Sequence, residues 1–222
     1  LESFRRGIWR LLRGARRQHD GIAIYYSMPS IIAGALTGEE EKLNAARDAW
    51  VKLIEDCGLQ YEFVAYGQVA KGILRNGEFK VVILPYELAL SKAEADALRA
   101  FAKAGGTLIA TRPVGVRDDL GRPQTPGLLD DLFGARLEGA GQAVEPTVAL
   151  TESIAGLPAG TEMKLPVAVS QLVLAGAKAR ATAGGGTVPA LAAGANGRAI
   201  LLNLDLTHFE QERRFHSPTE KQ

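Results

Sequence analysis

Two short apolar runs with a helical pattern between them constrain the fold of this chain more than any other feature. Residues 80–84 and 107–111 are mainly aliphatic, and a proline follows each run within two positions. Such runs are typical of buried strands. Between them, Ser91 and Glu94 have the spacing of a capping box, apolar residues then keep helical spacing, and two glycines follow. Strand, helix and strand in this order form a right-handed βαβ unit, so the sequence predicts an α/β protein.

The same alternation extends over the first half of the chain. Residues 21–26 and 61–66 predict two further strands, and residues 39–57 predict a helix that Gly58 ends. The segment between Tyr26 and that helix is rich in small residues and predicts a loop. Shorter helices are predicted at residues 68–74 and 127–133. We therefore expect a three-layer α/β/α fold with a mostly parallel, flavodoxin-like sheet.

The second half has a different composition and predicts a β-rich C-terminal part. Glycine-rich segments at residues 183–187 and 194–197 predict hairpin turns. We expect three units: a linker helix at residues 1–20, one α/β domain at residues 21–206 and a polar tail at residues 207–222. The predicted strands of this part are residues 147–150, 172–175, 188–193 and 198–204.

Composition restricts the partners and the compartment. The chain has 222 residues, 46% of them hydrophobic, and a formal charge of +1, so neither nucleic acid nor an acidic partner is expected. No apolar run is long enough to cross a membrane, and no signal peptide is visible, which favours the cytoplasm. Residues 4–17 predict an arginine-rich amphipathic helix. Its charged face is interpreted as solvated or docked on an acidic neighbour, with a nucleic-acid patch as the alternative.

Any ligand site is expected beyond the carboxyl ends of the parallel strands, where open α/β sheets bind their ligands. Polar and aromatic side chains there could stack on a sugar and form hydrogen bonds with it. Other residues expected at this edge are Ser30, Pro85, Glu87 and Arg117. The candidate rim residues are Tyr26, Ser27, Tyr86, Thr111 and Arg112.

No pattern at these turns carries catalytic chemistry. The strand ends contain no glycine-rich nucleotide fingerprint and no nucleophile elbow. The three histidines, His19, His208 and His216, lack metal-ligand spacing. Cys57 is predicted on the buried side of the last turn of its helix, where a reactive thiolate is not expected. The neighbouring aspartates at 118–119 and 130–131 are interpreted as loop solvation and helix-face charges. We therefore predict no catalytic residue, no metal and no cofactor.

Five segments, taken in order, resemble one known family: residues 25–30, 47–61, 84–86, 105–109 and 127–134. Over residues 5–206 the chain resembles the middle domain of the bacterial β-galactosidases of glycoside hydrolase family 42. That domain is called the trimerisation domain, and its fold is similar to class I glutamine amidotransferases. The resemblance implies a parent enzyme whose catalytic glutamates lie on a separate (β/α)8 barrel that this sequence does not contain.

Two functions follow as hypotheses. The first is a non-catalytic accessory domain that forms homo-oligomers, trimers by resemblance, and contacts the catalytic barrel of its parent chain. The alternative is a domain that binds a sugar or small ligand, or an amidotransferase-like enzyme, in the crevice at the carboxyl ends of the strands. The strand-end turns carry no cysteine, which weakens the amidotransferase hypothesis.

Overall fold

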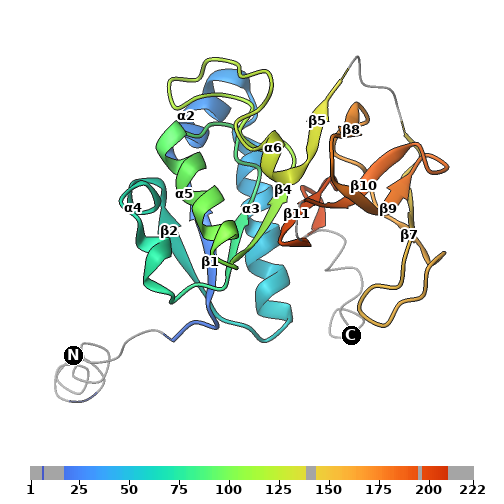
Figure 1. The fold of residues 1–222 in the computed structure, drawn as a ribbon, viewed down its shortest axis with the longest axis horizontal. Coiled ribbons are helices and arrows are strands. Elements are labelled where there is room, and N and C mark those ends of the chain that lie inside the picture. Colours follow the sequence, from blue (N-terminus) through green and yellow to red (C-terminus); the bar gives the residue numbers. More distant parts are fainter. Residues whose placement is uncertain (1–6, 8–17, 139–143, 195–196, 210–222) are drawn as a thin grey trace.

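A computed structural model describes Gly7 and residues 18–138, 144–194 and 197–209. Its centre is a nine-stranded sheet whose strands run in the order β2-β1-β3-β4-β11-β10-β9-β6-β7. Figure 1 shows the first half of the chain, blue to green, on one side and the later strands, orange to red, on the other. The predicted arginine-rich helix at residues 4–17, His216 and most of the predicted polar tail lie outside the described residues.

Five parallel strands form one half of the sheet. Strand β1 (Ile22–Tyr26) lies between β2 (Tyr61–Ala65) and β3 (Val81–Leu84), and β4 (Thr107–Thr111) and β11 (Ala199–Leu202) follow in order. Each neighbouring pair in this half is parallel. The order runs outward in both directions from β1, which is the flavodoxin-like arrangement. The predicted mostly parallel α/β sheet is confirmed.

Helices cover both faces of this half. One face packs against three helical segments through Val69, Leu74 and Leu98, and the other packs against a single long helix through Trp50 and Ile54. The fold is therefore three-layered here. The segments on the first face are α4 (Tyr66–Ala70), the 3-10 helix η2 (Ile73–Asn76) and α5 (Lys92–Lys103), and the helix on the second face is α3 (Glu40–Asp56).

The β-rich part continues the same sheet instead of forming a separate one. Strand β11 pairs in parallel with β4 on one side and antiparallel with β10 on the other. Buried Asn203 fixes this junction, because its side-chain amide nitrogen donates to the backbone carbonyls of Val169 and Pro189. The antiparallel strands are β6 (Thr147–Leu150), β7 (Glu162–Lys164), β9 (Lys178–Ala183) and β10 (Val188–Ala193), and a separate pair is β5 (Ala135–Leu137) with β8 (Leu172–Leu174).

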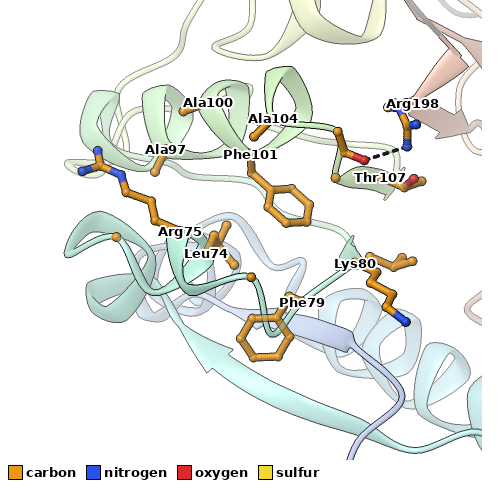
Figure 2. A pocket seen from close by; sticks show the side chains of 15 residues that line it. Leu74, Arg75, Phe79, Lys80, Ala97, Ala100, Phe101, Ala104, Thr107 and Arg198 are labelled. Carbon is orange, nitrogen blue, oxygen red and sulfur yellow. Dashed lines mark hydrogen bonds between the residues drawn. The ribbon is translucent and has the colours of Figure 1, made fainter.

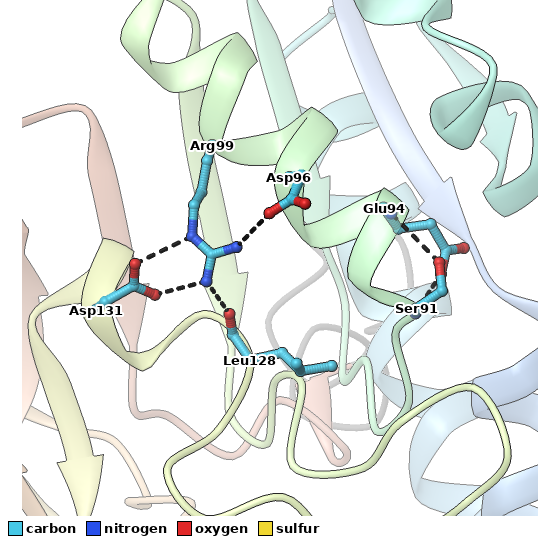
Figure 3. A network of polar contacts seen from close by, with 6 residues as sticks. All are labelled: Ser91, Glu94, Asp96, Arg99, Leu128 and Asp131. Carbon is cyan, nitrogen blue, oxygen red and sulfur yellow. Dashed lines mark hydrogen bonds and ion pairs between the residues drawn. The ribbon is translucent and has the colours of Figure 1, made fainter.

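Helix α5 begins where its sequence predicts. The Ser91 hydroxyl accepts a hydrogen bond from the Glu94 amide, and the Glu94 carboxylate accepts one from the Ser91 amide. The second oxygen of Glu94 accepts a hydrogen bond of 2.6 Å from the Tyr25 hydroxyl in β1, so the cap also ties the helix to the sheet. Further along the helix, Arg99 donates to Asp131 and to the Leu128 carbonyl (Figure 3).

Two local expectations are wrong. The segment predicted as a loop after Tyr26 is helix α2 (Met28–Thr37), and Ser27 is its N-cap, accepting a hydrogen bond from the Ser30 amide. Cys57 is exposed instead of buried, because it is the C-cap of α3 and Gly58, with φ +70°, turns the chain away there. None of the described helices is long and apolar enough to cross a membrane.

Candidate functional site

The candidate rim residues at the carboxyl edge of the parallel strands line more than one space. Tyr86, Thr111 and Arg112 line a cavity of about 250 Å³, together with Glu39 and Asp205. Tyr26 and Ser27 instead line a much smaller space of about 10 Å³, roughly enough for one water molecule. The five candidate rim residues of the sequence analysis are therefore not gathered around one crevice.

Tyr86 has an unusual backbone. Its φ of +54° lies in the left-handed region, which non-glycine residues rarely adopt. The conformation is held on both sides: the Tyr86 amide donates to Thr111 Oγ1 and its hydroxyl donates to Glu39 Oε1, each over 3.0 Å. Burial, and then the Glu39 carboxylate, raise the pKa of the Tyr86 phenol. This turn thus has a strained backbone, and the side chain at its centre is a neutral phenol instead of a nucleophile.

The two candidate residues at the end of β1, Tyr26 and Ser27, serve the fold. Ser27 is 3% exposed, caps α2 and donates its hydroxyl to the Ala89 carbonyl. Tyr26 is partly buried, lies edge-on to Phe63 and has the Arg47 guanidinium 5.5 Å from its ring centroid. Because the Ser27 hydroxyl is committed to backbone groups, it is not available as a nucleophile.

Arg112 is the most deeply placed charge at this edge. It is 1% exposed, and its Nη2 donates to Asp130 Oδ1 over 3.0 Å and to the Ala135 carbonyl. Its Nε and Nη1 atoms have no partner among the described residues. Burial lowers the pKa of Arg112, and Asp130 opposes that effect. The interpretation of Asp130 as an exposed helix-face charge is wrong, because this residue begins helix α6 (Asp130–Phe133) as the buried counter-ion of Arg112.

A buried carboxylic acid lies beside the smaller space. Glu87 is 3% exposed, and its Oε2 has no partner among the described residues. Burial raises the pKa of Glu87 well above its ordinary value, the nearby Ser30 hydroxyl opposes the shift, and the Glu94 carboxylate adds to it. The sequence analysis placed Glu87 and Ser30 at this edge, but only the structure brings them together under α2.

The described residues of this edge lack the parts of a hydrolytic or metal site. His19 lies at the opposite, amino edge, where it stacks on Phe79 and accepts a hydrogen bond from the Gly21 amide. His208 is exposed beyond β11. In the portion of the chain that the structure describes, no group of three histidine, cysteine or acidic residues could hold a metal ion. The arrangement can bind water or a small polar group, but it offers no activated nucleophile.

The most distinctive surface near this edge belongs to α2. Its residues 28–37 include no charged side chain. Ser30, Ala33 and Gly34 face inward, and Ala33 packs on Leu88 and Ala89. On the opposite side Met28, Ile32 and Leu36, four residues apart, are 43%, 55% and 81% exposed. We call these three side chains the α2 stripe. This stripe was not predicted, because the segment after Tyr26 was expected to be a loop.

Comparisons with known proteins point to one family. The sequence model of the family described as "Beta-galactosidase trimerisation domain" matches residues 22–207. No curated protein matches the chain in sequence.

Solved structures share the fold at low identity. Gan42B, a GH42 β-galactosidase from G. stearothermophilus, has a TM-score of 0.67 and 16% identity, over 91% of this chain and 30% of that one. The β-galactosidase of Rahnella sp. R3 has a TM-score of 0.64 and 19% identity, over 90% and 32%. A ThuA-like protein of Bacteroides uniformis has a TM-score of 0.57 and 17% identity, over 86% and 85%. The chain thus spans about a third of the length of Gan42B and of the Rahnella enzyme.

Proposed function

Because the chain belongs to the β-galactosidase trimerisation domain family, we propose that it is a non-catalytic domain that assembles with further copies of itself, as a trimer. In this proposal the domain serves a glycoside hydrolase of the β-galactosidase type, and the catalytic groups lie on another domain. The absence of an activated nucleophile among the described residues of the carboxyl edge supports a non-catalytic role. Tyr86 at the strained turn gives no support to an amidotransferase reaction.

The observation that carries the assembly proposal is the α2 stripe. Exposed apolar side chains are common singly, but three successive turns of one uncharged helix form a continuous apolar strip. The helix itself is held firmly on its inner side, since the Ser30 hydroxyl both donates to and accepts from the backbone of Ala89. A rigid apolar face of this kind is suited to packing against another subunit, where desolvation of the three side chains favours association.

The test is the molar mass in solution. We expect light scattering with size exclusion to give three times the mass of the single chain at high protein concentration. The double variant Ile32→Glu and Leu36→Glu should shift the protein to monomer, because two carboxylates would be buried in an apolar contact. Both side chains already point to solvent, so the fold of the isolated chain should survive, as circular dichroism would check.

Two other exposed leucines supply the control. Leu120 and Leu157 are 70% and 45% exposed and lie outside α2, so changing each to glutamate should leave the mass unchanged. A wild-type chain that stays monomeric, or an α2 double variant that assembles like the wild type, would contradict the proposed role of this surface.

A further inference from the structure

A second cavity lies at the amino edge of the sheet, opposite the edge that carries the α2 stripe. It has a volume of about 590 Å³ and opens between α5 and η2, where β3 and β4 begin. Leu74, Phe79 and Phe101 form its floor and are 5–6% exposed. Figure 2 shows the Phe101 ring directed down from α5 toward Leu74 and Phe79. We call this cavity the amino-edge pocket. Its size is within the usual range for small-molecule sites.

Small residues keep the amino-edge pocket open. Besides Phe101, α5 and its C-cap present alanine to the pocket at 97, 100 and 104, so these three positions contribute only methyl groups to the wall. At the end of the pocket, Gly106 is required by Phe101, because a Cβ on Gly106 would lie 2.3 Å from the Phe101 ring. The ring can therefore turn across the floor only because residue 106 has no side chain. The amino-edge pocket therefore depends on alanine and glycine at these positions of the sequence.

The charged residues that line the pocket are all positive. Arg75, Lys80 and Arg198 line it, and the described lining includes no acidic residue. The ion pairs of the described residues involve none of these three cations. Arg198 is held in place, since its Nη1 donates to the Gly105 carbonyl (Figure 2). An apolar floor with unpaired cations around it favours a ligand that has an apolar body and a negative charge.

We propose that the amino-edge pocket binds a small amphipathic anion, an aromatic or branched apolar group that carries a carboxylate. The apolar group lies on Phe79 and Phe101, and the carboxylate remains near the mouth, within reach of Lys80, Arg75 or Arg198. Two aromatic rings in the floor give a flat ring system the most contact area. This site is independent of the proposed assembly through α2, because the two lie at opposite edges of the sheet.

The test uses three probes that share one ring system and differ in charge: 2-naphthoate, 2-naphthalenemethanol and 2-naphthylmethylammonium. Each is titrated into the 15N-labelled chain and followed by amide spectra. Gly72, Gly77, Gly105 and Gly106 all line the pocket and give signals in the distinct glycine region. We expect 2-naphthoate to move these four signals with a dissociation constant on the order of 1 mM or below. The alcohol should bind more weakly and the ammonium most weakly.

Variants locate the site. Ala100→Trp places a large ring into the pocket from an exposed position and should abolish the shifts while distant signals stay unchanged. Lys80→Glu should weaken 2-naphthoate about fivefold at low salt, whereas it should strengthen the ammonium probe. Lys71→Glu is the matched control, because Lys71 is exposed nearby but does not line the pocket. It should change neither affinity by more than about twofold.

Several outcomes would overturn the proposal. Equal binding of the three probes would remove the preference for an anion. Shifts that spare the four glycines, or that persist in Ala100→Trp, would place the binding elsewhere. If the four glycine signals respond to protein concentration and not to 2-naphthoate, the pocket is a contact between subunits. A wild-type chain that stays monomeric but still binds 2-naphthoate at this pocket would reject the proposed function and leave this inference standing.

Discussion

At the scale of single residues, two adjacent aspartates show how position decides the energetic role of a charge. Asp130 is turned inward, where it holds Arg112 and accepts a hydrogen bond from the Gly127 amide. Asp131 is turned outward and receives two hydrogen bonds from Arg99 (Figure 3). The hydrogen bonds of Arg99 lower the pKa of Asp131. The side chains of Arg112 and Asp130 are 1% and 10% exposed, against 34% and 64% for Arg99 and Asp131.

Alanine at these two positions should therefore have very different effects. We expect Asp130→Ala to lower the free energy of unfolding by about 3 kcal/mol, because it leaves the Arg112 guanidinium buried without a counter-ion. Asp131→Ala should cost less than about 1 kcal/mol, since its partner stays in contact with water. Urea unfolding of the two variants gives the comparison. Equal costs would show that burial of the Arg112 pair has no energetic consequence.

Glu87 predicts a pH dependence with a definite sign. Burial raises the pKa of Glu87, so the folded protein keeps a proton that the unfolded chain releases above about pH 4.5. The free energy of unfolding therefore falls as pH rises above about 4.5 toward the raised pKa of Glu87. The contribution of Glu87 to stability is most favourable below pH 4.5. Glu87→Gln mimics the protonated acid and should match the wild type near pH 4 but exceed its unfolding free energy near pH 8.

Urea unfolding at both pH values measures this difference. Glu41→Gln, which changes an exposed carboxylate in α3, is the control and should leave the difference between the two pH values as in the wild type. A Glu87→Gln variant whose advantage over the wild type does not grow with pH would contradict the assignment of a protonated Glu87.

Sequence reasoning reached some of these residues and not their partners. It placed Arg112 and Glu87 at the carboxyl edge, because each follows a predicted strand. It could not pair Arg112 with Asp130, which is 18 positions away, since the pairing depends on the path of the loop between them. It likewise could not show that Thr111 holds the Tyr86 amide across 25 positions. Contacts that depend on the path of a loop leave no pattern in the local sequence from which they could be predicted.

At the scale of elements, local capping signals account for what was predicted and for what was missed. Helix α5 was predicted because its capping box lies next to a clear apolar period. Helix α2 was missed although Ser27 is followed by a proline in the first turn, which is a recognised start signal. Its outer face is apolar like parts of its inner face, so no helical period stood out. A helix with one polar side would have been found.

The α5 cap gives a prediction for a single element. Ser91→Ala removes the acceptor of the Glu94 amide and should lower the free energy of unfolding by about 1 kcal/mol. Ser91→Asp retains an acceptor near the helix N-terminus and should stay within about 0.5 kcal/mol of the wild type. Thermal or urea unfolding provides the measurement. Equal losses in both variants would indicate that the serine acts through packing instead of capping.

At the scale of the whole molecule, β11 joins the two halves of the sheet. The pattern of the first half predicted a parallel sheet with helices on both faces, because each strand and helix there has its own period. The second half was predicted as β-rich, but its attachment was not, since β11 pairs with β4 between residues 91 positions apart, such as Leu108 and Ala199. We propose that residues 21–206 form one cooperative domain with the continuous sheet as its centre.

Leu201 in β11 tests this proposal because it is fully buried at the junction. Leu201→Ala should lower the free energy of unfolding by about 3 kcal/mol through the cavity it creates. If the sheet unfolds as one unit, hydrogen exchange should show the same loss of protection at Ile24 in β1 and at Ala192 in β10, on opposite sides of the junction. Leu157→Ala, at a 45% exposed site, is the control and should change neither the free energy of unfolding nor the protection of these two amides. Loss of protection at Ala192 alone would mean that the antiparallel strands form an independently unfolding unit, because the parallel half would then keep its stability without them.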